Sequence, residues 1–361
     1  MVSRNPGELK SSRNRWSAWF EGRLDRGPVI YAEAPRDPLR SGLPLLSDPG
    51  SVEGRWTDLE HRLASLGQRM DGTWSGGDAV PSWFPNLGPG VVAACTGPWP
   101  TFTEDSVWFN ELPDNSLEAI LGHLRFDPGN RYWRLIQELS ARAVARADGD
   151  WIVSLTDLGG DLDILASLRG GEKLLVDLLE SPELVTACRT AIGQLWLECF
   201  REQNRLLASA GQEGYSAWIP AWYAKPWSVL QCDLSVMFSS RLFEEFVLPE
   251  LIEKSEAMAR SIYHLDGPGE WRHLDSILSV PGISAIQYVS VPGDPPNEDP
   301  SWLPYYRKIA EAGKGVFIFA KDPIRLRELA RGMPAERLAC HVAFDSIGEA
   351  GEFMEAFATG V

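Results

Sequence analysis

The sequence predicts an α/β fold, a (β/α)8 TIM barrel with an N-terminal helical and Trp-rich extension. Short β-rich runs alternate with longer helical patterns, as in a parallel sheet covered by helices. No GxGxxG fingerprint follows a strand, which argues against a doubly wound dinucleotide-binding sheet. The second half of the 361-residue chain is the most regular. Its predicted strands, each followed by a helix, are 261–266, 284–289, 315–320 and 338–344.

The first half is less regular but continues the alternation. We predict one domain over 1–361, with an extension and first strand in 1–80 and the barrel body in 80–361. The predicted strands are 28–34, 151–157 and 215–220. The main predicted helices are 57–70, 115–148, 182–209 and 240–259, the last interrupted near Pro249 because proline lacks an N–H group.

Composition excludes several classes of function. The chain has 34 basic and 50 acidic residues and a net charge of −16, without any Lys/Arg-rich run. This pattern argues against nucleic-acid and membrane partners and favours a small-molecule substrate. No apolar run approaches the roughly 18 residues of a membrane span, and the N-terminus lacks the apolar segment of a secretory signal. The five cysteines are scattered, without a CxxC pair, so we expect reduced thiols in a cytoplasmic protein.

Fifteen tryptophans are unusual for this length, and many lie in Pro/Gly-rich stretches. Trp218 and Trp222, in AWIPAWYAKPW, are candidates for binding substrate because indole rings form walls for flat or apolar ligands. The alternative is that such residues only cover the core. An exposed Trp-rich patch, for example in 71–113, would favour a homodimer.

Polar residues at predicted strand ends are the candidate site, because the chemistry of (β/α)8 barrels lies there. His264 and Asp266 alternate along one strand and therefore point to the same side. We expect Cys340 on the last strand to face the barrel interior, and His341 to face the helices. Imidazole, carboxylate and thiolate together would make a three-ligand zinc site with an open fourth position. The alternative for His264 is a buried histidine hydrogen-bonded to a carboxylate.

Other polar residues are candidates for acid–base chemistry or substrate binding. Asp157, in TDLGGDLD, would act with His264 and Asp266 in catalysis, whereas Asp161 or Asp163 would cap the following helix. The remaining substrate-binding candidates are Glu33, Asp233, Tyr263 and Gln287. Asp233 has helix capping as its alternative. No GxSxG or P-loop motif occurs, so serine-hydrolase and nucleotide chemistry have no support.

From about residue 80 to the end, the chain resembles the uroporphyrinogen decarboxylase-like superfamily. The segments that carry the resemblance are PNLGPG, SVWF, TDLGGDLDILASLRG, QCDLS, FEEFVLPEL, YHLDGPGEWRHLD, AIQYV and IAEAGKG. The superfamily includes decarboxylases and zinc- and corrinoid-linked methyltransferases, and the resemblance implies a barrel with a deep cleft at the carboxyl ends of its strands. The arginine-bearing signature of the decarboxylase branch is absent, since only Arg36 follows the first predicted strand.

In the methyltransferase branch, zinc is bound by an H-x-C motif and a distant cysteine. By this resemblance His264 matches the motif histidine and Cys340 the distant cysteine. Asp266 stands in place of the motif cysteine, which leaves a bound metal with less thiolate donation and more Lewis acidity.

Three hypotheses of function follow. The first is a metal-dependent methyltransferase-like enzyme that holds zinc or another divalent transition metal and acts on a small organic substrate in a Trp-lined cleft. By the resemblance, its methyl donor or acceptor would be a cobamide on a separate corrinoid protein. The second is a decarboxylase or lyase of a small organic acid, with Asp/His acid–base chemistry. The third is a non-catalytic barrel that binds a ligand.

Overall fold

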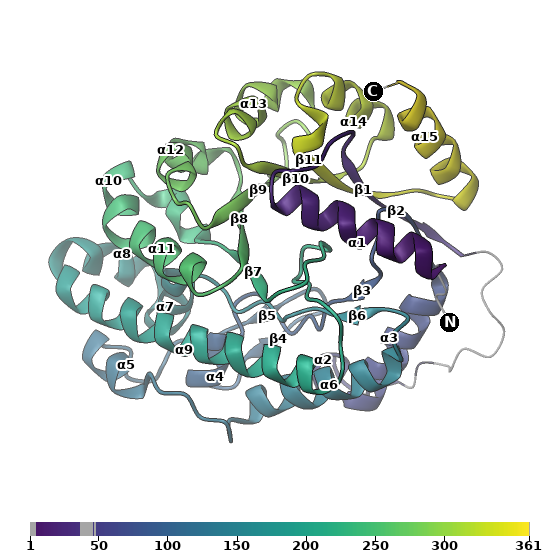
Figure 1. Ribbon diagram of the computed structural model, residues 1–361. Coiled ribbons are helices and arrows are strands. Elements are labelled where there is room, and N and C mark those ends of the chain that lie inside the picture. Colours follow the sequence, from purple (N-terminus) through teal and green to yellow (C-terminus); the bar gives the residue numbers. More distant parts are fainter. Residues whose placement is uncertain (1–4, 37–45, 47, 361) are drawn as a thin grey trace.

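The computed structural model describes residues 5–36, 46 and 48–360. Its centre is a seven-stranded sheet in the order β2-β1-β11-β10-β9-β8-β7, with helices packed around it (Figure 1). Only β2 is antiparallel to its neighbour. The strands of this sheet are β1 (Val29–Pro35), β2 (Thr73–Gly77), β7 (Trp227–Leu230), β8 (Arg260–Asp266), β9 (Ile283–Val289), β10 (Gly315–Ala320) and β11 (Leu338–Ala343).

Two small sheets accompany the large one: a parallel pair, β3 (Ser82–Trp83) with β6 (Ile152–Val153), and an antiparallel pair, β4 (Thr101–Phe102) with β5 (Val107–Trp108). A closed barrel is not shown, because no ladder between described strands joins the β3–β6 pair to the large sheet. Pro81 and Pro85 flank β3 and have no N–H to donate, which keeps this strand short.

The strand predictions for the second half of the chain are confirmed, with β8 to β11 within one residue of the expected bounds. The predicted strand 215–220 is wrong. Only an isolated bridge between Tyr215 and Tyr223 forms there, and the strand of this region is β7. Pro220 interrupts the segment, while all four residues of β7 are buried.

Helices cover the sheet and the segments beside it. The predicted helix 182–209 is confirmed as α9, and a π-helical turn interrupts the helix near Pro249 as expected. The helices are α1 (Pro6–Phe20), α2 (Val52–Thr57), α3 (Leu59–Gly72), α4 (Val92–Thr96), α5 (Leu117–His123), α6 (Arg131–Ala147), α7 (Asp161–Arg169), α8 (Gly171–Glu180), α9 (Pro182–Ser209), η1 (Asp233–Met237), α10 (Ser240–Leu242), η2 (Phe243–Val247), α11 (Leu248–Glu256), η3 (Pro268–His273), α12 (Leu274–Leu278), η4 (Pro300–Trp302), α13 (Leu303–Glu311), α14 (Pro323–Arg331), η5 (Ala335–Arg337) and α15 (Ile347–Gly360). Among the described residues, no helix has both the length and the apolar character that crossing a bilayer requires.

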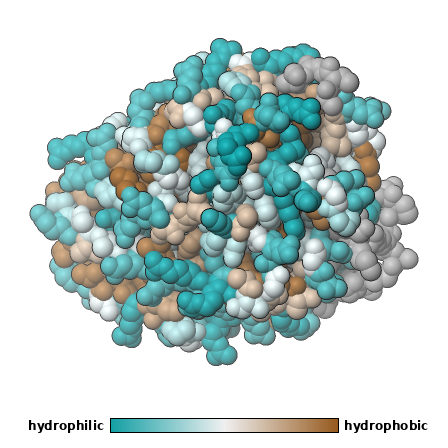
Figure 2. All heavy atoms as spheres, viewed as in Figure 1, coloured by the Kyte–Doolittle hydropathy of each residue, from teal (hydrophilic) through white to brown (hydrophobic). Residues whose placement is uncertain are grey.

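Helix α1 packs on the face of the sheet that also carries His264. Its Trp16 stacks on Phe317 of β10, with ring centroids 6.4 Å apart, and the Trp16 indole N–H donates to the Asp78 carbonyl. Phe20 of α1 contacts Trp227 of β7. This aromatic cluster fills the face near the amino ends of the strands. Polar side chains on the same face therefore gather toward the carboxyl ends. On the side of the molecule seen in Figure 2, hydrophilic residues predominate and hydrophobic ones are interspersed.

Candidate metal centre and adjoining cavity

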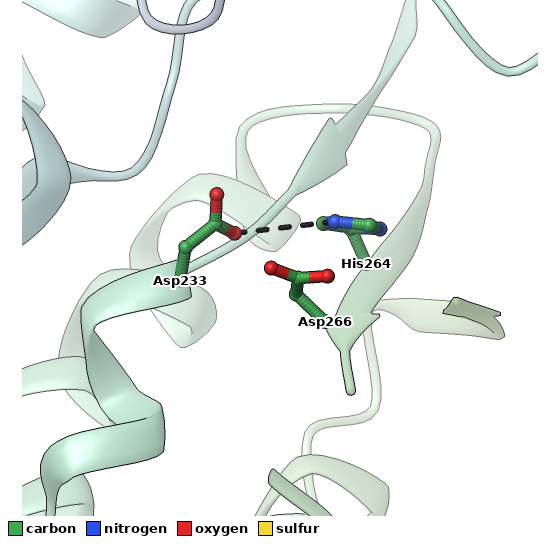
Figure 3. Close-up of side chains that lie close together, drawn as sticks. All are labelled: Asp233, His264 and Asp266. Atoms are coloured by element: carbon green, nitrogen blue, oxygen red, sulfur yellow. Dashed lines mark ion pairs between the residues drawn. The ribbon is translucent and has the colours of Figure 1, made fainter. Parts of the chain in front are cut away.

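Three side chains converge at the carboxyl end of β8 (Figure 3). His264 and Asp266 belong to the strand, and Asp233 is the first residue of η1. One ligand atom from each lies within 4.8 Å of the others, so the three can hold one metal ion. The expectation that His264 and Asp266 point to the same side is confirmed. Asp233 was expected to bind substrate, and its place among the metal-competent residues was missed.

Gln287 of β9 fixes the orientation of the His264 ring. Its amide Nε2 donates to the Tyr288 carbonyl at 2.9 Å, which turns Oε1 toward His264 Nδ1. Nδ1 is therefore the protonated nitrogen in this hydrogen bond, and Nε2 carries the lone pair. Nε2 lies 4.0 Å from Asp233 Oδ1, too far for a hydrogen bond. Burial lowers the pKa of His264 and so favours the neutral imidazole that a metal ion needs.

The two carboxylates have no compensating cation among the described residues. Asp233 Oδ1 is buried and has no hydrogen-bond partner. Burial, together with the neighbouring Asp266, raises the pKa of Asp233 to about 7. A buried oxygen without a partner is costly, and a divalent ion would relieve this cost. The residues present therefore fit a divalent metal, with one imidazole and two carboxylates as donors.

Two further carboxylates hold the acidic ligands in place. Asp163 accepts the backbone N–H groups of Asp233 (3.0 Å) and Leu234 (2.9 Å) and thereby caps η1. Glu270 accepts the Ser235 hydroxyl at 2.9 Å and the Asp266 backbone N–H at 3.3 Å. The expectation that Asp163 or Asp161 caps α7 is wrong. The N-cap of α7 is Gly160, which has no side chain to cap with, and Asp163 lies in the first turn and is engaged across the site.

Cys340 is not part of this group, and the expectation that it faces His264 is wrong. Along the sheet, His264 pairs with Gln287, Gln287 with Phe317, and Phe317 with Ala339. Because side chains alternate along a strand, Ala339 and His341 share the face of His264, and Cys340 points to the other face. Its thiol is buried 3.7 Å from the Val29 carbonyl, and burial raises its pKa.

Two expected substrate-binding residues also lie elsewhere. Tyr263 precedes His264, so it points to the opposite face and is buried in the larger core. Trp222 packs in the cluster around α1, where its indole N–H donates to the Glu213 carbonyl at 3.4 Å. Gln287 is fully buried, and its contact is with His264.

A cavity of about 370 Å³ lies at the carboxyl ends of β1, β10 and β11. Glu33 and Trp218, two of the expected substrate-binding residues, line it together with His341 and Phe319. Trp218 also meets His264 edge to face, with ring centroids 5.1 Å apart. The indole is therefore a shared wall between the cavity and the metal group. It comes from the 215–223 segment, which lies between the sheet and α9 in Figure 1.

Asp157 belongs neither to the metal group nor to the lining of this cavity. Its Oδ1 accepts the Gly159 backbone N–H at 2.9 Å. Burial raises its pKa to about 7, and the nearby Asp163 carboxylate adds to the increase. A carboxyl with this pKa is partly protonated at neutral pH and can transfer a proton. Its role in catalysis remains a prediction.

The chain matches no protein-family model, and no curated protein is significantly similar to it.

Proposed function

We propose that this chain is a metal-dependent, methyltransferase-like enzyme that acts on a small organic substrate at the carboxyl ends of its strands. The observation that carries the proposal is the convergence of Asp233, His264 and Asp266, with ligand atoms within 4.8 Å and lone pairs not used by the protein. The proposal includes membership of the uroporphyrinogen decarboxylase-like superfamily and a location in the cytoplasm. The five cysteines, all buried and free, support that compartment.

An opened (β/α)8 barrel is part of the same proposal. In the part of the chain that the structure describes, eight strands have parallel partners, namely β1, β3, β6, β7, β8, β9, β10 and β11. Single backbone hydrogen bonds extend the β3–β6 pair. The Ser154 N–H donates to the Trp83 carbonyl, and the Leu155 N–H donates to the Ser216 carbonyl. These bonds support a barrel that is interrupted beside β3 and β6.

Zinc or another divalent transition metal, when bound, would supply Lewis acidity toward an oxygen atom of the substrate. The donors contain no thiolate, and this favours an oxygen-bearing substrate over a thiol. The residues of the chain do the positioning. Gln287 holds the His264 tautomer, and Asp163 and Glu270 hold the backbones of the two acidic ligands. The Trp218 indole packs edge to face against the His264 ring.

Methyl transfer with a cobamide on a partner protein rests on the sequence resemblance. The test is visible spectroscopy of methylcobalamin mixed with zinc-loaded protein, with His264→Ala as the control. We expect a spectral change that needs both the metal and His264. No binding of free or protein-bound cobamide would end the methyl-transfer proposal.

Decarboxylation or bond cleavage in a small organic acid is the second candidate. The observation in its favour is Asp157, whose buried carboxyl has a pKa of about 7 and can exchange a proton near neutral pH. Metal-dependent turnover of an organic acid without cobamide, lost in Asp157→Asn, would support it. The third hypothesis, a non-catalytic barrel, would be favoured if His264→Ala kept both ligand affinity and cellular effect.

A further inference from the structure

The cavity beside Trp218 contains more positive than negative charge. Two guanidinium groups of α3, Arg62 and Arg69, line it, and Glu33 is the one acidic residue among the described residues of its lining. This excess of positive charge differs from the composition of the whole chain, in which acidic residues outnumber basic ones by 50 to 34. Glu33 is already engaged, because His341 Nε2 lies 3.1 Å from its carboxylate and Arg69 lies 3.7 Å away. Glu33 therefore does not pair with Arg62.

Arg62 is the cation whose charge is least compensated. Its Nη2 donates to the Asn86 carbonyl at 2.7 Å, and its guanidinium lies 5.9 Å from the Trp56 ring. Its Nε is buried without a hydrogen-bond partner, and it forms no ion pair with a carboxylate of the residues that the structure describes. Burial lowers the pKa of Arg62, which means that keeping its guanidinium charged costs free energy. A bound anion would offset that cost.

The walls of the cavity indicate the shape of such an anion. Aromatic rings surround it, supplied by Tyr31, Trp83, Trp218 and Phe319. Rings of this kind prefer flat, apolar partners in stacked or edge-to-face contact. The volume of about 370 Å³ lies within the usual range of small-molecule pockets. A charged group near Arg62 and a flat body between aromatic walls together describe a planar organic acid.

We propose that this cavity is a binding site for a small planar organic carboxylate, with its carboxylate on Arg62 and its ring between the aromatic walls. The site goes beyond the proposed function and does not need a metal ion. None of Asp233, His264 and Asp266 lines the cavity, and Trp218 is the wall that separates it from them.

Isothermal titration with benzoate tests the site, with neutral benzamide as the isosteric control and inorganic phosphate as a non-planar anion. We expect benzoate to bind with a Kd of about 1 mM or lower, benzamide at least about tenfold more weakly, and phosphate not to displace benzoate. Arg62→Met should weaken benzoate by about tenfold to a hundredfold, because it removes a charged hydrogen-bond donor.

Arg142→Met is the matched control, since Arg142 is a partly exposed arginine paired with Glu60 away from the cavity. It should leave benzoate binding unchanged, as should Asp266→Asn, which alters the metal group alone. The comparison of benzoate with benzamide needs no variant, so the test stands even if Arg62→Met does not fold. Equal binding of the two, no binding of benzoate, displacement by phosphate, or loss of benzoate in Asp266→Asn would each overturn the proposal.

Discussion

Two clusters of acids in this molecule have opposite environments. In the first, Lys254 Nζ lies 2.6 Å from both Asp161 Oδ1 and Glu250 Oε1, and all three side chains are 1% exposed. The Trp196 ring lies 4.5 Å from the same ammonium group. In the second, the described residues beside Asp233 and Asp266 include the His264 imidazole, whose pKa burial lowers, and no lysine or arginine is paired with the two carboxylates.

The difference is the counter-charge. Lys254 supplies it to the first cluster, which connects α7 with α11 and so belongs to the fold. The second cluster has no cation among the described residues, and its buried Asp233 Oδ1 has no hydrogen-bond partner. The first cluster also keeps buried oxygens without a partner, Asp161 Oδ2 and Glu250 Oε2, but these carboxylates have the lysine beside them. A cluster that contains its own cation stabilises the chain, whereas a cluster without one is suited to a ligand.

The largest expected effect is on stability. Lys254→Met leaves two buried carboxylates without their cation, so we expect a loss of about 3–5 kcal/mol in the free energy of unfolding. Urea denaturation measures it. Lys308→Met, at a half-exposed lysine paired with Asp275, is the control and should cost less than about 1 kcal/mol. A loss this small for Lys254→Met would mean that the cluster around Lys254 does not stabilise the fold.

Removing a charged residue from the second cluster should leave stability unchanged and weaken metal binding. Asp266→Asn removes a ligand and relieves the repulsion with Asp233, so metal affinity should fall by about a hundredfold or more while stability without metal is kept. Calorimetric zinc titration measures the affinity, and denaturation measures the stability. The control is Asp275→Asn at an exposed position. If Asp266→Asn binds zinc normally, Asp266 is not a ligand.

A smaller effect is expected at Gln287. Gln287→Leu removes the acceptor that orients the His264 ring, and loss of such an outer partner costs about tenfold to a hundredfold in metal affinity. Gln287→Glu keeps an acceptor and should restore most of the affinity. Unchanged affinity in the leucine variant, measured by the same titration, would show that the ring is held by its packing alone.

A further effect is a pH dependence of stability without metal. The pKa of Asp157 rises from 3.8 to about 7 on folding, so the folded state binds the proton more tightly. The favourable contribution of this group is present at low pH and is lost as pH rises from about 4 to about 7. Asp157→Asn should therefore flatten the stability profile over that range, and its Oδ1 can still accept the Gly159 N–H. An unaltered profile in urea denaturation would exclude a raised pKa.

The sequence was sufficient for β8 to β11 and for the shared direction of His264 and Asp266, because apolar runs and strand alternation are local properties. It was not sufficient to predict the direction of the Cys340 side chain. Adjacent residues of a strand point to opposite faces, and in a buried strand the sequence allows either Cys340 or His341 to point to a given face. Asp233 was missed as a ligand because β7 was missed. Had WSVL been identified as a strand, Asp233, three residues after its end, would have been a candidate beside His264. The pairing of Lys254 with Glu250 has the local i,i+4 spacing of a helix, but its pairing with Asp161, 93 residues away, had no signal in the sequence.

Metal content is the most direct test of the uncompensated cluster. The wild type, Cys340→Ser, Asp233→Asn and Asp266→Asn would be loaded with zinc, desalted and examined by elemental analysis, with folding checked by circular dichroism. We expect stoichiometric zinc in the wild type and in Cys340→Ser, and little or none in the two aspartate variants. Zinc that is lost in Cys340→Ser but kept in Asp233→Asn, or no zinc in the folded wild type, would contradict a metal centre formed by Asp233, His264 and Asp266.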